Sequence, residues 1–423
     1  MMYFEKGSES ADLSSQELKE CLCCALKTVG DRRKVLLLPP DQTRYHSRAG
    51  ELTKYAYEYY REKTYAVMPA LGTHYAMSDV EIASMFPDVP RSLFRVHDFR
   101  KDLVTLGQVP GEYVREVSEG RLDYPWPAQV NKMLVNDNVD LILSIGQVVP
   151  HEVIGMANHN KNIFVGVGGA EGISKSHYLG AVYGMERIMG RVDTPVRKVL
   201  NYASTKIAPD MPVVYVQTVV GRGEDGRLVV RGLYIGNDDE CFRKAADLSL
   251  KVNFQMLEKP LKKVVVYLDP AEFKSTWLGN KAIYRTRMAL ADAGELIILA
   301  PGLKEFGEDP QINKLIRKYG YVGSDKVQEL VKHNDDLKQN LSAAAHLIHG
   351  STEGRFTVTY CTDTISRSDI EAINFKHAEL GQMMQKYDVT RLKDGFNVMK
   401  DGEEIFYISN PALGLWSVNS RFR

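Results

Sequence analysis

Short apolar runs, each followed by a polar loop and a helical pattern, alternate along the first half of the chain. β-branched and aliphatic residues fill four such runs: KVLLLPP, TYAVMPALGTH, VDLILSIGQVVPH and NIFVGVGG. These runs predict buried strands, and we expect a helix to begin near Ser174 after the last of them. Strands that alternate with helices at this spacing are typical of a parallel sheet covered by helices.

The second half begins with a different pattern and then repeats the first. Residues 211–236 alternate between apolar and polar positions around GEDG, which predicts a β-hairpin. We expect a helix from Asp238 to about Lys259, where Pro260 stops it. Further strands are predicted in KKVVVYLDP, GELIILAPGLKEFGED and FTVTYCTD, and a helix in KSTWLGNKAIYRTRMALAD.

The pattern therefore predicts an α/β fold of two domains, each with a mainly parallel, helix-covered sheet. The length agrees, because 423 residues exceed the size at which a single hydrophobic core stops growing. We place the domain boundary near residue 255. This gives an N-terminal domain over 1–255 and a C-terminal α/β domain over 256–423.

The composition limits the kinds of partner and the compartment expected for the chain. The chain has 54 basic and 54 acidic side chains, so nothing in its net charge indicates a nucleic-acid or membrane partner. The first twenty residues are polar where a secretory signal needs an apolar core, and we expect a cytoplasmic protein. Five cysteines are too few for a disulfide framework, and we interpret the CLCC cluster as thiols on a helix rather than a zinc site.

Polar residues that could carry chemistry follow the predicted strands, and ligands of such sheets bind beyond the carboxyl ends of the strands. Arg44 has a planar fork suited to a carboxylate, and Asp41 could hold that fork in place. A surface turn with a salt bridge is the ordinary explanation of the same pair. His74 and His151 follow two other strands, so they could form an acid/base pair on opposite sides of a substrate, or be structural histidines.

The segment after His151 holds further candidates. Lys161 precedes an apolar run, where it could cap a strand edge or serve as an amine for covalent attachment to a carbonyl-like group. The following loop contains Gly168 and Gly169 and could cradle a phosphate, although Glu171 occupies the last glycine position of a G-x-G-x-x-G motif. His177 is expected on the first helical turn, as a metal ligand or a surface histidine. Lys281 lies in a predicted helix of the second half, where lysines are usually solvated.

Taken together, these stretches resemble the nickel-pincer lactate racemase family, whose members have two α/β domains. DQTR is similar to the family's D-x-T-R element, GTH to its G-T-H element, and PHEVIGMANHNK to its segment of proline, histidine, glycine and lysine. The intervals from His151 to Lys161 and from Lys161 to His177 match the family's base, cofactor lysine and nickel-ligand histidine. NKA and GELIILAPGLKEFGED resemble elements of its second domain.

The resemblance implies roles for these residues. His74 and His151 would be the two bases, Arg44 would grip the substrate carboxylate with Asp41 nearby, and Lys281 would contact the substrate. The implied activity is that of a racemase or epimerase that inverts C2 of a 2-hydroxy acid by hydride transfer to and from the cofactor. The N-terminal domain would carry the histidines and the cofactor lysine, and the C-terminal domain would close the active site.

The resemblance also implies a cofactor. Lys161 would carry a pyridinium-type mononucleotide with two sulfur-bearing arms through a thioamide, with Gly168 and Gly169 beside it. His177 would complete a square-planar nickel site. The enzymes that synthesise this cofactor would be the partners of the chain, and protein made in a host that lacks them is expected to lack the cofactor.

Three departures from the family pattern are visible. Tyr45 and His46 follow DQTR where the family often has proline, Asn158–Asn160 replace its Ser-Gly-Gly run, and Leu278 replaces a substrate-contacting glutamine. The last change leaves the 2-hydroxy acid open. The alternatives are a phosphate-ligand or nicotinamide-dependent α/β enzyme, disfavoured by the missing dinucleotide fingerprint, and a non-catalytic cofactor-binding protein, disfavoured by the two predicted bases.

Overall fold

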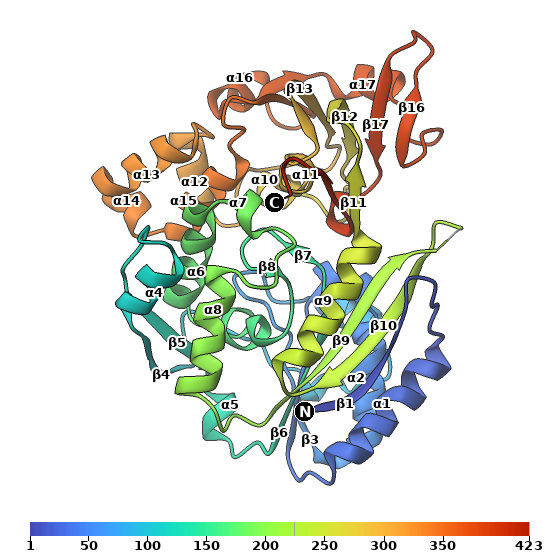
Figure 1. Cartoon of the computed structure of the whole chain (residues 1–423), viewed down its shortest axis with the longest axis vertical. Coiled ribbons are helices and arrows are strands. Elements are labelled where there is room, and N and C mark those ends of the chain that lie inside the picture. The colour runs from blue at the N-terminus through green and yellow to red at the C-terminus, as the bar shows by residue number, and fades with distance from the viewer. Residues whose placement is uncertain (224, 423) are drawn as a thin grey trace. The chain divides into compact units, whose positions relative to one another are not determined.

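The computed structural model of the chain describes residues 1–223 and 225–422. Two six-stranded, mainly parallel sheets with associated helices confirm the predicted α/β class (Figure 1). The chain divides into two compact units, which we call the first unit (Met1–Ser176 and Met189–Asn253) and the second unit (His177–Ile188 and Phe254–Arg423). None of the helices in the described part of the chain has the length and apolarity needed to cross a membrane.

The sheet of the first unit has the strand order β1-β10-β9-β6-β2-β3. Its strands are β1 (Met2–Gly7), β2 (Val35–Leu38), β3 (Thr64–Val67), β6 (Leu141–Gln147), β9 (Val213–Arg222) and β10 (Leu228–Gly236). β2 pairs in parallel with β3 and β6, and β6 pairs in parallel with β9, whereas β1, β10 and β9 pair antiparallel. Every residue of β2 and β6 is buried, as expected of central parallel strands.

Helices cover both faces of this sheet. On one face, α1 (Ser15–Val29) and α2 (Ala49–Tyr60) pack in a core that contains Leu233 and Ile235 of β10. The other face is covered by α9 (Asp239–Asn253) (Figure 1). Tyr234 packs in the core on this face, because successive side chains of a strand point to opposite faces of the sheet. The hairpin β9–β10 is confirmed, although Glu224 of the predicted turn lies outside the described residues.

The remaining elements of the first unit connect these layers. They are η1 (Gln42–Ser47), η2 (Arg61–Lys63), α3 (Asp79–Met85), η3 (Arg91–Leu93), β4 (Leu103–Val109), α4 (Gly111–Val117), β5 (Trp126–Asn131), α5 (Met133–Asn136), β7 (Pro150–His151), β8 (Gly155–Met156), η4 (Asn162–Gly166), α8 (Pro195–Tyr202) and η5 (Ala203–Ile207). β4 pairs with β5 and β7 with β8, both antiparallel.

Three expectations about the secondary structure between residues 161 and 257 were wrong. The apolar run NIFVGVGG forms the π-helical turn η4 instead of a strand, because a short apolar run does not by itself distinguish the two. The next helix, α6 (Ala170–Tyr183), begins before Ser174, so His177 lies beyond its first turn. Helix α9 ends at Asn253 instead of near Lys259, because the following residues form a strand, β11 (Phe254–Leu257).

The second unit has a sheet of order β15-β14-β13-β12-β17-β16, parallel except between β16 and β17. The strands of the second unit are β11, β12 (Leu261–Tyr267), β13 (Leu290–Leu299), β14 (Phe356–Cys361), β15 (Lys376–Ala378), β16 (Gly395–Val398), β17 (Glu404–Ile408) and β18 (Leu415–Val418). β11 and β18 form a separate two-stranded sheet. Its other elements are α7 (Met185–Ile188), α10 (Thr276–Gly279), α11 (Lys281–Thr286), α12 (Pro310–Tyr319), α13 (Ser324–His333), α14 (Asp335–Lys338), α15 (Leu341–Gly350), α16 (Arg367–Ala372), α17 (Leu380–Lys386) and η6 (Pro411–Leu413).

The strands predicted in KKVVVYLDP and FTVTYCTD are confirmed as β12 and β14. The single helix predicted from residue 274 is two short helices, α10 and α11, and its last residues belong to β13, which begins at Leu290. The segment His177–Ile188 is held in the second unit by ion pairs. Oε1 of Glu186 lies 3.2 Å from Arg287 Nε and 3.4 Å from Arg355 Nη2.

Candidate active site

Loops at the carboxyl ends of β2, β3 and β6 are tied together in the first unit. The residues after β2 and β3 form a parallel bridge between Pro40 and Ala70. The loop after β3 then turns at Gly72, whose φ of 58° is in the left-handed region that favours glycine. The Gly72 N–H donates a 2.8 Å hydrogen bond to the carbonyl of Gly166, at the end of η4. This bond connects the loop that carries His74 to the turn that follows Lys161.

Asp41 and His74 form a hydrogen-bonded pair at this edge of the sheet. Nδ1 of His74 lies 2.6 Å from Oδ2 of Asp41, which is only 5% exposed. The other oxygen, Oδ1, accepts hydrogen bonds from the backbone N–H and the hydroxyl of Thr43, at 3.1 and 2.5 Å. Burial alone would raise the pKa of Asp41, but His74 and the Thr43 hydrogen bonds outweigh it and lower the pKa to about 2.

The pair fixes the direction of proton transfer at His74. An ionised carboxylate can only accept hydrogen bonds, so Nδ1 of His74 carries the proton and Nε2 keeps its lone pair. In the neutral ring, Nε2 is then the nitrogen that can take up a proton. The sequence allowed Asp41 to hold the fork of Arg44. In the described part of the chain Asp41 makes no ion pair with Arg44 and binds His74 instead.

Arg44 lies in η1, one turn after Asp41. Its backbone N–H donates to the carbonyl of Asp41 at 3.0 Å, and its φ of −117° makes a kink inside η1. The side chain is half-buried. A guanidinium on such a turn can bind a carboxylate in two-point geometry.

His151 lies in the small hairpin formed by β7 and β8, directly after β6. The side chain is buried, and its Nδ1 accepts a 3.1 Å hydrogen bond from the backbone N–H of Val153. Oε2 of Glu152 lies 3.9 Å from the same nitrogen. A neutral imidazole that accepts at Nδ1 carries its proton on Nε2, so the tautomer of His151 is opposite to that of His74.

Lys161 directly precedes η4 and is partly buried. Desolvation is the largest influence on its ammonium, followed by repulsion from Arg44, attraction to Glu152 and Asp41, and repulsion from Arg197. Together they lower the pKa of Lys161 to about 8. Its Nζ makes no hydrogen bond or ion pair with any described residue. An amine in this state is a nucleophile near neutral pH.

The glycine loop after η4 is closely packed. A Cβ on Gly168 would lie 2.0 Å from the carbonyl oxygen of Phe164, so the backbone there leaves no room for a side chain. The Gly168 carbonyl accepts a 2.9 Å hydrogen bond from Nε2 of His97, whose Nδ1 lies 3.1 Å from Nδ2 of Asn131. Burial lowers the pKa of His97, which favours the neutral ring that this pattern requires. The sequence offered no local signal for this role of His97.

The other predicted site residues belong to the second unit. His177 lies in α6, at the first residue of the segment His177–Ile188. Lys281 begins α11, and its Nζ lies 5.7 Å from the ring centroid of Phe273. Trp277 and Leu278, in α10, are partly exposed.

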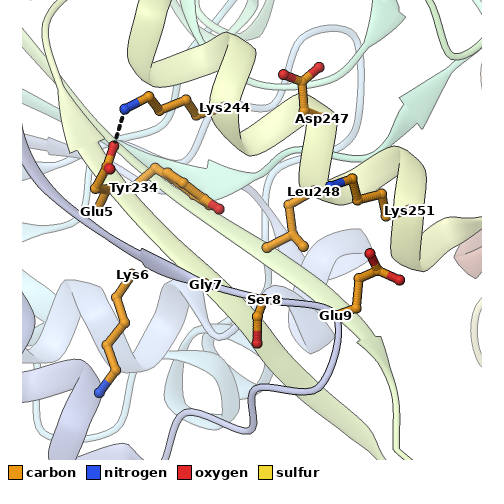
Figure 2. A pocket seen from close by; sticks show the side chains of 10 residues that line it. All are labelled: Glu5, Lys6, Gly7, Ser8, Glu9, Tyr234, Lys244, Asp247, Leu248 and Lys251. Atoms are coloured by element: carbon orange, nitrogen blue, oxygen red, sulfur yellow. Dashed lines mark hydrogen bonds and ion pairs between the residues drawn. The ribbon is translucent and has the colours of Figure 1, made fainter.

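A cavity of about 500 Å³ lies in another part of the first unit, between β1, β10 and α9 (Figure 2). Its lining residues are Glu5, Lys6, Gly7, Ser8, Glu9, Tyr234, Lys244, Asp247, Leu248 and Lys251. Three lysines and three carboxylates are among them, and the figure shows Lys244 paired with Glu5. None of the predicted site residues lines this cavity. Over residues 1–223 and 225–422, no group of three or more His, Cys, Asp and Glu side chains is arranged to hold a metal ion by itself.

Comparison with known proteins identifies similar chains. Residues 15–188 match the family described as the lactate racemase N-terminal domain. This segment contains all the predicted site residues except Lys281. A search of curated protein sequences finds no match.

Two solved structures resemble the whole chain. A crystal structure of a protein from Thermotoga maritima has a TM-score of 0.84 and 25% sequence identity, over 97% of this chain and 100% of that one. The lactate racemase apoprotein from Thermoanaerobacterium thermosaccharolyticum has a TM-score of 0.71 and 15% identity, over 96% of this chain and 94% of that one. The second comparison shows a common fold.

Proposed function

Residues 15–188 of this chain belong to the lactate racemase N-terminal domain family, and on that premise we propose that the protein is a racemase or epimerase that inverts C2 of a 2-hydroxy acid. The observation that carries this proposal lies within the matched segment. There the Asp41–His74 pair and the ammonium of Lys161 are close enough to interact electrostatically, next to Arg44. A proton acceptor, a carboxylate-binding cation and a nucleophilic amine are the groups that the proposed reaction needs.

The cofactor in this proposal is the nickel-pincer nucleotide, held covalently by Lys161, with Gly168 and Gly169 beside it and His177 on the metal. When bound, it supplies the acceptor and donor of a hydride at C2 of the substrate. The residues present fit the group. The amine of Lys161 has a lowered pKa and no partner among the described residues, so it could form the covalent bond, and His177 would supply a nitrogen ligand to the metal.

Residues of the chain bind the substrate and transfer its hydroxyl proton. Arg44 binds the substrate carboxylate, and Nε2 of His74 accepts the proton of the 2-hydroxyl group. Asp41 stabilises the positive ring that results, because its carboxylate remains ionised. His151 donates a hydrogen bond from Nε2 to the substrate oxygen on the opposite side, and the proton taken up by His74 is returned as the product alcohol forms. To accept a proton there, as the opposite enantiomer requires, His151 must move its own proton to Nδ1 and give up the bond from the Val153 N–H.

The proposal assigns the catalytic histidines and the cofactor lysine to the N-terminal domain, over 1–255. The C-terminal domain, over 256–423, would contribute Lys281 to substrate binding and close the active site. A small 2-hydroxy acid is the proposed substrate, and the enzymes that synthesise the cofactor are the proposed partners.

The decisive test is the intact mass of protein co-expressed with the cofactor-synthesising enzymes, with nickel analysis and peptide mapping of the same sample. We expect an adduct on Lys161 and about one nickel per chain, as one square-planar site requires. Lys161→Ala is the matched control and should carry neither. Loaded protein should then invert 2-hydroxy acids with retention of deuterium at C2. No adduct, under conditions that load a known racemase, would overturn the proposal.

A further inference from the structure

The turn that leads into Lys161 has an unusual backbone. Asn158 and His159 both have positive φ, 70° and 57°, and neither is a glycine. Two successive left-handed residues with side chains are strained, and such a turn persists only where its surroundings hold it. The turn runs from Met156, at the end of β8, to Asn160, directly before Lys161.

One buried side chain, Arg197 in the first turn of α8, holds this turn. It is 1% exposed, and its Nη2 donates a 2.7 Å hydrogen bond to the carbonyl of Met156. Both terminal nitrogens also reach the Asn158 carbonyl, at 3.3 and 3.4 Å, and Nη1 donates to Oδ1 of Asn160. A single planar guanidinium therefore binds three of the five residues of the turn.

Asn160 extends the same network to α8 and the turn after it. It is fully buried, and its Nδ2 donates to Oδ1 of Asn201 at 2.7 Å and to Oγ of Ser204 at 3.2 Å. The ring of His159 packs against the rings of Tyr215 and Phe242, with ring centroids 4.0 and 5.1 Å apart, respectively. The residue that precedes Lys161 is thus fixed at both ends of its amide group.

The guanidinium of Arg197 lies over the ring of Phe242, with Cζ 4.2 Å from the ring centroid, but in the described part of the chain its burial has no ion pair to offset it. Among the residues that the structure describes, no carboxylate lies within ion-pair distance of Arg197. A cation in the first turn of a helix also opposes the helix dipole. A buried charge of this kind is costly, and a well-packed apolar side chain often serves the fold as well. What the guanidinium supplies is a set of coplanar donors that match the carbonyl oxygens of one particular turn.

We propose that Arg197 is a positioning residue for Lys161: by clamping the left-handed turn Met156–Asn160, it fixes where the lysine amine stands relative to the Asp41–His74 pair. The hydrogen bonds of Arg197 to the turn do not depend on what reacts with Lys161. The effect of the clamp on cofactor attachment rests on the proposed function. In that function Lys161 carries the cofactor, and a displaced amine would be attached inefficiently.

The test measures the amine of Lys161 in the apo protein. Acetylation by acetic anhydride is followed against pH by peptide mass mapping, with exposed Lys274 as the internal reference. In Arg197→Met and Arg197→Lys we expect the pH profile of Lys161 to move toward that of Lys274. Cofactor loading during co-expression should fall about tenfold or more. Arg285→Lys, a change of an equally buried arginine in the second unit, should leave the Lys161 profile unchanged.

A second pair of variants distinguishes the clamp from a general loss of folding. Glycine adopts positive φ without strain, so Asn158→Gly should restore the Lys161 profile, at least in part, in the Arg197→Lys background. A folded Arg197→Lys protein with the wild-type Lys161 profile would overturn the inference, and so would an equal change in Arg285→Lys. These profiles are measured without cofactor, so they test the clamp even if the wild-type protein acquires no adduct. The absence of an adduct would overturn the proposed function and not the clamp.

Discussion

The ionised carboxylate of Asp41 accepts a 2.6 Å hydrogen bond from Nδ1 of His74. Asp41 lies in the loop after β2 and His74 in the loop after β3. Their pairing fixes which ring nitrogen of His74 carries the proton, and this choice determines whether the ring can act as a base.

Asp41→Asn should therefore change the tautomer of His74. An asparagine amide that donates to Nδ1 places the ring proton on Nε2, so the loaded enzyme should lose on the order of 10²- to 10⁴-fold in kcat. The ¹⁵N shifts of the ring nitrogens in the apo protein report the tautomer directly. Thr43→Val, which removes a hydrogen bond from Asp41 but keeps the carboxylate, should retain the original tautomer. An unprotonated Nε2 in Asp41→Asn would contradict this account.

Lys161→Met should stabilise the apo protein in a pH-dependent way. The pKa of Lys161 in the folded protein is about 8, below the value of about 10.4 expected in the unfolded chain. Below pH 8 the ammonium is charged in both states, so the folded state bears the full cost of desolvation. That cost falls as pH rises from about 8 to about 10.5.

At pH 7 the Lys161→Met variant should be more stable by on the order of 3 kcal/mol, and the difference should disappear near pH 10.5. Denaturant unfolding at the two pH values measures it. Lys274→Met changes an exposed lysine and should show no such trend. An equal difference for Lys161→Met at both pH values would exclude a depressed pKa as its cause.

Gly168→Ala and Gly169→Ala should differ in stability although the residues are neighbours. A Cβ at 168 meets the backbone oxygen of Phe164 at 2.0 Å, whereas a Cβ at 169 meets Oε1 of the Gln129 side chain at 2.3 Å. A side chain can move aside and a packed backbone cannot. We expect Gly168→Ala to lose about 2 kcal/mol and Gly169→Ala less than about 1 kcal/mol, compared by thermal unfolding. A larger loss of stability in Gly169→Ala than in Gly168→Ala would show that the backbone at Phe164 can move away from residue 168.

Glu186→Gln should destabilise the second unit. The carboxylate lies 3.2 Å from Nε of Arg287, whose side chain is only 7% exposed. Its loss leaves a buried guanidinium with a weaker acceptor, which should cost about 1–3 kcal/mol. The control is Glu371→Gln, which breaks an exposed pair with Arg367 and should change stability by less than about 1 kcal/mol. Similar effects in the two variants would mean that burial does not strengthen the Glu186 pair.

The parts of the fold that the sequence predicted are those with strong local patterns. Fully apolar β2 and the alternating residues of β9 and β10 form the strands that their patterns indicate. The ends of these strands also led to Asp41, His74 and His151. The sequence did not indicate the hydrogen-bond partner of Asp41. Arg44 is near Asp41 in the sequence, whereas His74 comes near only when β2 and β3 pair.

Other features had no local signal. The residues of η4 are apolar except Asn162, and a short apolar run does not by itself distinguish a π-helical turn from a strand. Arg197 is one arginine in an amphipathic helix, and its role depends on a turn 37 to 41 positions earlier in the chain. His97 lies in a loop and acts through a glycine carbonyl that it meets only in the folded protein.

The π-helical turn η4 makes the chain intolerant of length changes between Lys161 and α6. A π-helical turn contains one more residue than an α-helical turn, so removal of one residue from 162–166 would rotate the start of α6 by roughly 100° relative to Lys161. Substitutions among its apolar residues have no such effect. Across relatives of this protein, side chains in η4 should therefore vary through evolution while insertions and deletions there are absent.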